Sequence, residues 1–110
     1  MHFHTKGTCE DADAGFKATG GHVMPHGKPH GFMHNEGPHA GNLPNLIVRK
    51  DGTALIELYS DLVTLTDGPA ALLDADGSTL IIHENQDDHV TQPIGGAGGR
   101  VACGVIKVAG

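Results

Sequence analysis

The sequence contains no tryptophan, one tyrosine and three phenylalanines, so aromatic packing contributes little to any core. Hydrophobic residues make up 38% of the chain, and most of them are leucine, isoleucine, valine and alanine. A chain of this length can build one small core, and we expect a single domain over residues 1–110. Seventeen glycines and six prolines favour short strands and shaped loops over long helices. The composition therefore predicts an all-β fold.

Positive charge is also scarce. Seven lysines and arginines stand against thirteen aspartates and glutamates, which gives a formal net charge of -6. Such a chain has no basic patch that could neutralise several phosphates, so we exclude nucleic acid as a partner. No apolar run approaches the roughly 18 residues of a membrane span, so we expect no membrane role.

Two features of the sequence indicate different cellular compartments. The N-terminal residues 1–4 have neither a basic region nor an apolar signal segment, which predicts a cytoplasmic location for the chain as written. The two cysteines, Cys9 and Cys103, permit one disulfide, and a disulfide points to an oxidising compartment. Both compartments remain open at this point.

Strand-like patterns are concentrated in the second half of the chain. Residues 45–49 and 53–59 are rich in apolar and β-branched residues and flank an Asp51-Gly52 pair, which predicts a β-hairpin. Residues 79–83 and 101–108 predict two further strands. The polar, glycine-rich segment between these last two strands is expected to be a long loop.

Nine histidines are the most unusual feature, and seven of them lie in the first 39 residues. This part of the chain shows no lasting helical or strand periodicity, so we predict a long loop over residues 5–43. The histidines are spaced through glycine- and proline-bearing sequence, which favours a defined metal site over a tag or a loose metal-sequestering tract. Metal ligation would then supply the order that packing cannot.

Three groups of histidines have spacings that suit metal ligation. His2 and His4 are two residues apart, so on a strand both project from one face. His22, His30 and His39 are followed closely by Asn42, and three imidazoles with an oxygen donor suit a tetrahedral zinc site. The alternative is that these histidines are solvated surface residues, as we expect for His26 and His34.

The C-terminal half contributes further candidates. His83 ends an apolar strand and is either a half-buried residue or a ligand, and Asp87 or Asp88 could accept a hydrogen bond from a ligand imidazole. The glycines of residues 95–99 allow close backbone approach to a site. Arg100 follows them and is either a surface charge or a group that attracts a small anion.

Taken in order, these motifs span the whole chain. They are His2-Phe3-His4, Gly21-His22, the spacing of 8 and 9 residues to His30 and His39, Pro38-His39-Ala40-Gly41-Asn42-Leu43-Pro44, Ile82-His83 and the run from Gly99 to Ile106. In this order and spacing they resemble the motifs of copper/zinc superoxide dismutases, most closely the bacterial branch. The resemblance implies a Greek-key, immunoglobulin-like β-barrel or sandwich with long metal-binding loops.

The resemblance also implies the cofactors and the role of each residue. Copper is implied on His2, His4, His22 and His83, and zinc on His22, His30 and His39, with His22 shared as a bridging imidazolate. A Cys9–Cys103 disulfide, Arg100 as the guide for superoxide and Asp87 as the link between the two metal sites are implied as well. The implied activity converts superoxide to oxygen and hydrogen peroxide, with His22 and Arg100 as catalytic residues. By family, the location would be periplasmic or secreted.

Two departures from the family pattern matter. Asn42 stands where the family carries a zinc-ligating aspartate, so zinc should bind more weakly through an amide oxygen, or water or His34 should complete the site. The sequence also starts at the first copper-ligand pair, so we expect an N-terminally truncated barrel that lacks roughly the first three to four strands. A remaining sheet of four strands would leave an open apolar face and free edges. We therefore predict a homodimer or higher homo-oligomer, with a non-enzymatic zinc- or copper-binding protein as the alternative function.

Overall fold

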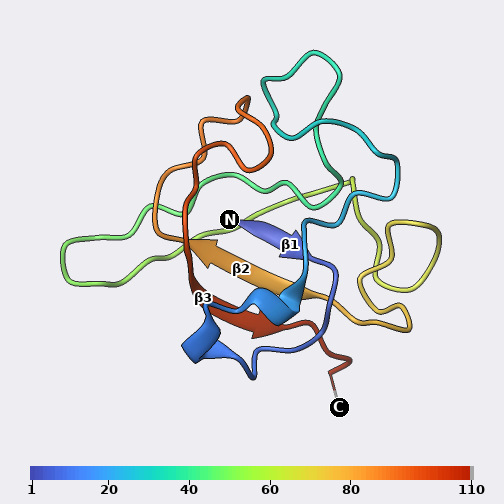
Figure 1. The fold of residues 1–110 in the computed structure, drawn as a ribbon, viewed down its shortest axis with the longest axis horizontal. Coiled ribbons are helices and arrows are strands. Elements are labelled where there is room, and N and C mark those ends of the chain that lie inside the picture. Colours follow the sequence, from blue (N-terminus) through green and yellow to red (C-terminus); the bar gives the residue numbers. More distant parts are fainter. Residues whose placement is uncertain (110) are drawn as a thin grey trace.

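The computed structural model describes residues 1–109 and contains one antiparallel sheet with the strand order β1-β2-β3 (Figure 1). The strands are β1 (His2–His4), β2 (Thr79–His83) and β3 (Arg100–Val105). Two short 3-10 helices, η1 (Ala12–Ala14) and η2 (Lys17–Thr19), interrupt the first long loop. The fold is all-β, as predicted. The strand at residues 79–83 has the predicted bounds, whereas the last strand ends at Val105 rather than at residue 108.

The predicted hairpin is wrong beyond its turn. The turn at residues 49–53 forms, with hydrogen bonds from Gly52 N to Arg49 O (2.9 Å) and from Arg49 N to Thr53 O (2.8 Å). Within the described residues, neither flanking segment is a strand, and Leu55 and Tyr59 are 88% and 86% exposed. An isolated two-stranded ribbon is only marginally stable, and these segments join no sheet that would stabilise it. They form the long arm that extends away from the sheet (Figure 1), and the sheet has three strands instead of four.

Loop segments cover the edge of β1 that does not face β2. Phe3 N donates to Gly41 O (2.9 Å), Val23 N donates to Phe3 O (2.9 Å), and isolated bridges join His2 to Asn42 and His4 to His22. A side chain at Gly41 would approach Phe3 O to 2.6 Å, so only glycine allows the backbones to lie this close. This pairing brings His22 of the long loop next to the two histidines of β1.

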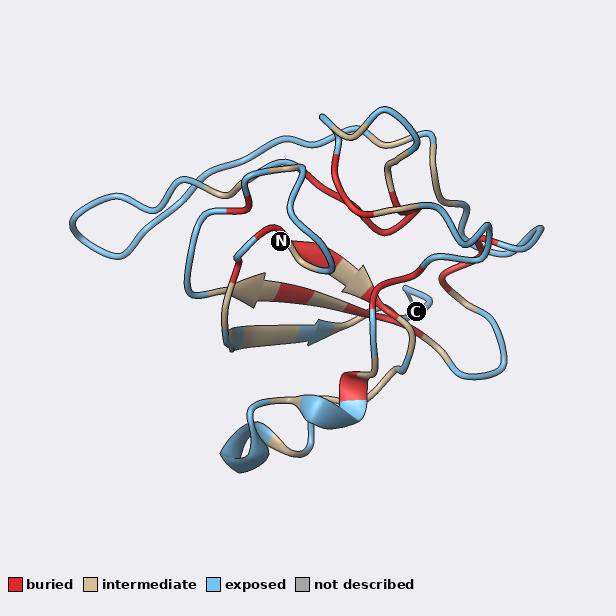
Figure 2. Cartoon of the chain, turned by 45° about the horizontal axis from the view of Figure 1, so that its top comes forward, coloured by how far each residue is buried: buried red, intermediate tan, exposed pale blue. Residues whose placement is uncertain are grey.

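The buried interior is small and largely polar. One apolar cluster is formed by Val23, Ala40, Ala70 and Leu72, with Phe3, Leu62, Val63 and Ile106 packed against it. Many of the most fully buried side chains are polar instead, and they include His2, His4, His30, Asn42 and Asp87. Figure 2 shows the buried positions running along the inner strands and the loops that cross above them. Burying polar groups is costly unless each finds a partner or an ion, so the centre of this fold is built for ligation rather than apolar packing.

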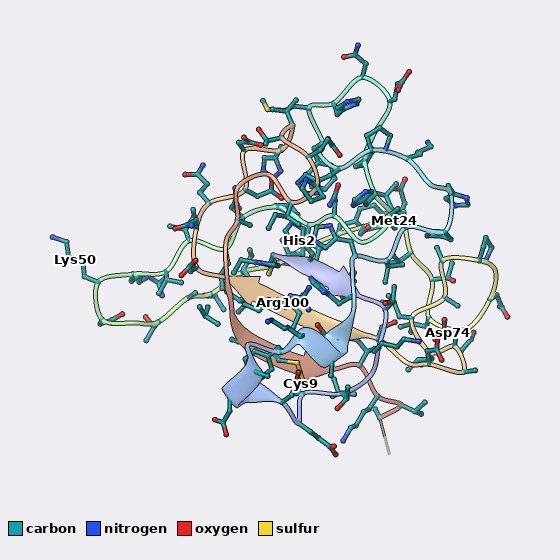
Figure 3. The ribbon with its side chains drawn as sticks, viewed as in Figure 1. His2, Cys9, Met24, Lys50, Asp74 and Arg100 are labelled. Carbon is teal, nitrogen blue, oxygen red and sulfur yellow. A yellow bond between two sulfur atoms is a disulfide. The ribbon has the colours of Figure 1, made fainter. Side chains whose placement is uncertain are left out.

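A disulfide ties the first long loop to the sheet. Cys9 and Cys103 are bonded, with their Cα atoms 5.8 Å apart, so the implied pairing is confirmed. The bond fastens the loop that carries η1 and η2 to β3, below Arg100 in the view of Figure 3. Among the described residues, no helix has the length and hydropathy needed to cross a membrane.

Candidate metal centre

Four imidazole nitrogens converge at the centre of the molecule. They are His2 Nδ1, His4 Nε2, His22 Nε2 and His83 Nε2, and each is buried without a hydrogen-bond partner in residues 1–109. These four histidines can place one ligand atom each within 4.8 Å of one another. Buried polar atoms normally have partners, so four such atoms facing each other indicate a place for a cation.

The other ring nitrogen of each strand histidine is held by the protein. His2 Nε2 donates to Asp87 Oδ2 (2.7 Å) and His4 Nδ1 donates to the Gly20 carbonyl (2.8 Å). His83 Nδ1 donates to the Gly98 carbonyl (3.0 Å). Each hydrogen bond fixes the tautomer, so that the lone pair of the remaining nitrogen points into the cluster.

Burial keeps these imidazoles neutral. It lowers the pKa of His2 to about 3, although the hydrogen bond to Asp87 acts in the opposite direction. It likewise lowers the pKa of His4 to about 4, against the hydrogen bond to Gly20. The pKa of His22 also falls far below its ordinary value because of burial and the neighbouring histidines. A metal ion binds the neutral form of imidazole, so these residues are ready to ligate at neutral pH.

His22 also belongs to a second cluster, with His30 and His39. The three can place one ligand atom each within 4.8 Å of one another, and His22 Nδ1 lies 3.1 Å from His39 Nδ1. Burial lowers the pKa of His39 as well. The two nitrogens of His22 therefore face different clusters, Nε2 the first and Nδ1 the second. His26 and His34 lie outside both groups.

Asp87 connects the two clusters. Its Oδ2 accepts from His2 Nε2, and its Oδ1 accepts from His30 Nε2 at 2.9 Å. Burial raises the pKa of this carboxyl, but the hydrogen bonds from His30 and His2 outweigh it and bring the pKa to about 2. Asp88 instead accepts from the backbone of Val90 and Thr91, so Asp87 is the one of the two that faces the histidines.

Sequence reasoning missed two residues that hold this arrangement, Asn45 and Gln92. Asn45 clamps the backbone of Asp87, because Asp87 N donates to its Oδ1 (3.0 Å) and its Nδ2 donates to Asp87 O (2.9 Å). Gln92 does the same for His30, with both distances 2.8 Å. Gly95 is one of the glycines predicted to allow close backbone approach: it has a φ of 66°, and a side chain there would collide with Asp87. No local pattern reveals these partners, since the two clamps join residues 42 and 62 positions apart.

Asn42 is buried between the second cluster and the loop backbone. Its Oδ1 accepts from Gly31 N (2.8 Å) and from His39 N (3.0 Å). Its Nδ2 lies 3.0 Å from His30 Nδ1. The residue is therefore at the second cluster, as its sequence position predicts, with its nitrogen toward His30.

Arg100 lies at the open side of the two clusters. The β2–β3 register pairs it with His83. Its Nη1 donates to Phe16 O and to Thr19 Oγ1, both at 2.9 Å. It lines a pocket of about 580 Å³ together with His4, Lys17, Gly21, His22, Met24, His39 and His83, among others. A small anion in this pocket would meet both a guanidinium and the ligand histidines.

Comparison with known proteins places these features in a family. Residues 1–106 match the family model of copper/zinc superoxide dismutase (SODC). The chain is 52% identical over 109 residues to superoxide dismutase [Cu-Zn] of Caulobacter vibrioides, and 41% identical over 108 residues to superoxide dismutase [Cu-Zn] 2 of Aquifex aeolicus. These matches cover 96% and 97% of the chain, and the chain spans 62% of each relative.

Solved structures agree with this match. A superoxide dismutase-like protein from Bacillus subtilis superposes with a TM-score of 0.84 at 42% identity, over 94% of this chain and 68% of that one. The clock protein EA4 superposes with a TM-score of 0.76 at 35% identity, over 94% of this chain and 66% of that one. The long loops and the short sheet are thus arranged as in proteins of this type.

Proposed function

Because the chain belongs to the copper/zinc superoxide dismutase family, we propose that its two histidine clusters bind copper and zinc and that the loaded protein dismutates superoxide. Copper and zinc are the cofactors that this family implies. The observation that carries the proposal is the placement of His22, whose two ring nitrogens face different clusters. One imidazole between two metal sites couples them, and few other functions require that arrangement.

The donor set fits the two ions. Copper would be held by His2, His4, His22 and His83, and zinc by His22, His30 and His39. The four unpartnered nitrogens of the first cluster support this assignment, since imidazole is a good ligand for both metals. Asp87 would fix the ring orientations at both sites at once, because it accepts one hydrogen bond from each.

Bound copper would supply the one-electron chemistry by which two superoxide ions and two protons become oxygen and hydrogen peroxide. The residues of the chain supply the rest. Arg100 attracts the anion and orients it in the pocket, and its hydrogen bonds to Phe16 and Thr19 keep the guanidinium in place. His22 is the residue that can hold a proton at Nε2 and release it to the reduced anion.

Anion attraction has to be local in this protein. The formal net charge is -6, so the molecule as a whole repels superoxide. Lys17 and Arg100 both line the pocket that contains His4, His22 and His83. This pair of positive charges supports a steering role for the pocket mouth.

A metal-binding protein without dismutase activity is the second candidate. Its support comes from Asn42, which replaces the carboxylate of the family pattern, and from a relative named superoxide dismutase-like protein YojM in Bacillus subtilis, 42% identical over 107 residues. Both candidates require bound metal, and they differ only in turnover.

One experiment separates the two candidates. Protein loaded with copper and zinc is analysed for metal content and then assayed for superoxide dismutation, with zinc-only protein as the control. Dismutase function requires activity that appears with copper and depends on it. Full copper occupancy without activity above the zinc-only control would leave the metal-binding function alone.

We further propose that the chain forms a homodimer or higher homo-oligomer. Large apolar side chains are exposed on the arm and on β3, including Ile47 (77%), Leu55 (88%) and Val101 (57%). Exposed apolar patches and free strand edges favour self-association. Light scattering at micromolar concentration should give at least twice the 11.4 kDa chain mass, and a monodisperse monomer would exclude this assembly.

An oxidising compartment, such as the periplasm or the extracellular space, is the location we propose. The Cys9–Cys103 disulfide supports it, because disulfides persist mainly in such compartments. Thiol trapping of the protein in its own cells should find both cysteines blocked. Two free thiols would favour the cytoplasmic prediction instead.

A further inference from the structure

The orientation of the Asn42 side chain determines what it can offer a metal ion. The residue is 1% exposed, so its amide has to satisfy its hydrogen bonds within the protein. Two backbone N–H groups, those of Gly31 and His39, point at one end of the amide from 2.8 and 3.0 Å. Only the oxygen can accept both, because a flipped amide would set its own N–H groups against two donors.

The other end of the amide is a donor aimed at a ligand residue. His30 Nε2 donates to Asp87 Oδ1, so His30 Nδ1 carries the lone pair of the neutral ring. Asn42 Nδ2 lies 3.0 Å from that lone pair and donates to it. Asn42 therefore presents N–H at the place where a ligating residue would present oxygen, and it competes with a metal ion for His30.

His34 does not replace the missing oxygen. Its Nδ1 accepts from Glu36 N at 3.1 Å, within its own turn, and it belongs to none of the histidine and aspartate groups that the described residues form. The second cluster consequently offers three imidazoles and no carboxylate ligand. A zinc ion with three protein ligands keeps an open position, which water or another small ligand fills.

We infer that the second metal ion is bound by His22, His30 and His39 alone and takes its fourth ligand from solvent, so that small anions bind to it directly. His22 and His39 line the same pocket of about 580 Å³ as Lys17 and Arg100. An anion that enters this pocket has access to both clusters. An ion that no carboxylate ligates also retains more of its positive charge than one bound by an aspartate, which favours an anionic fourth ligand.

This inference rests on the proposed metal centre. Cobalt(II) is a probe that distinguishes failure of the inference from failure of the metal centre itself. Cobalt replaces zinc in tetrahedral sites, and its d–d absorption reports ligand exchange. Copper is kept as Cu(I), which has no d–d bands. Sodium azide is then titrated into the Cu(I)/Co(II) protein, and cobalt affinity is measured by competition with a chelator.

The decisive variant is Asn42→Asp. One carboxylate oxygen still accepts hydrogen bonds from Gly31 N and His39 N, and the other takes the place of the amide nitrogen that faces His30. The matched control is Asn35→Asp, which makes the same change at an exposed position of the same loop. We expect azide to shift the cobalt bands of the unmodified protein with saturation. Asn42→Asp should bind cobalt at least about tenfold more tightly and lose the azide response, whereas Asn35→Asp should match the unmodified protein.

Each outcome decides the matter. Cobalt bands that ignore azide in the unmodified protein overturn the inference, whether or not Asn42→Asp folds. Equal cobalt affinities for folded Asn42→Asp and the unmodified protein also overturn it. If cobalt shows no tetrahedral bands, or keeps them in His39→Ala, the proposed metal centre itself fails.

Discussion

Asp87 accepts hydrogen bonds from two histidines of different clusters, from His2 at 2.7 Å and from His30 at 2.9 Å. No other described carboxylate joins the two groups in this way. Each histidine donates from Nε2, the ring nitrogen that faces away from its cluster. Asp87 therefore orients two prospective ligands without occupying a ligand position.

Replacing Asp87 should therefore weaken both metal sites together. In Asp87→Asn one oxygen becomes an N–H donor, so one of the two histidines loses its acceptor and its preferred tautomer. We expect copper and zinc affinities to fall by about 10- to 100-fold, measured by chelator competition. The control Asp88→Asn changes a neighbouring exposed carboxylate. Equal losses in both variants, or none in Asp87→Asn, would show that Asp87 does not position the ligands.

Asn45 should act on the same sites through Asp87. Asn45→Ala removes both hydrogen bonds of the backbone clamp and leaves the buried Asp87 N–H without its acceptor. We expect a loss of about 1 to 3 kcal/mol in the free energy of unfolding, together with weaker metal binding. Chemical denaturation and chelator competition measure the two effects, and Asn35→Ala is the exposed control. Unchanged metal affinity in Asn45→Ala would reduce the clamp to a stability role.

Arg100 is expected to set the rate of anion capture rather than copper content. In Arg100→Glu the pocket gains a negative charge, so the second-order rate constant of dismutation should fall by at least about tenfold. Unlike that of the unmodified protein, this rate constant should no longer decrease when salt is added. Arg49→Glu makes the same change on the exposed arm and should have little effect. Copper content is measured in parallel. An unchanged rate at full copper content removes Arg100 from the mechanism.

Protein stripped of metal by a chelator should lose stability as the pH falls below about 6.5, the ordinary pKa of histidine. His2 and His4 have folded pKa values of about 3 and about 4, so the unfolded chain binds more protons than the folded chain between pH 6.5 and those values. Stability is therefore complete above pH 6.5 and decreases by about 1.4 kcal/mol per pH unit for each such histidine.

Asp87 adds a second step at lower pH. Its folded pKa of about 2 lies below its ordinary value of 3.8, so its contribution is present above pH 3.8 and is lost toward pH 2. Denaturant midpoints measured from pH 8 to pH 2 provide the check. A midpoint that stays level between pH 7 and pH 5 contradicts neutral, buried histidines in the folded state.

The sequence predicted the site better than the sheet. Histidine spacing and the family resemblance selected the six histidines that the structure brings together in the two clusters, because these residues sit in short local motifs, and their roles as metal ligands stay predictions. Strand assignment at residues 45–59 failed, since apolar content and an Asp-Gly turn do not reveal whether a partner surface covers the segment. The Asp87 clamp by Asn45 and the amide orientation of Asn42 could not be predicted either, because both depend on contacts between distant loops.

The central claim is that two metal ions share the ring of His22. Electron paramagnetic resonance of protein loaded with Cu(II) and Co(II) tests it most directly, because an imidazolate bridge couples the two unpaired-electron systems. The account predicts that the Cu(II) signal of copper-only protein is largely lost when Co(II) fills the second cluster, and that His39→Ala, which disables that cluster, retains it. A full, unperturbed Cu(II) signal alongside bound Co(II) would contradict a shared His22.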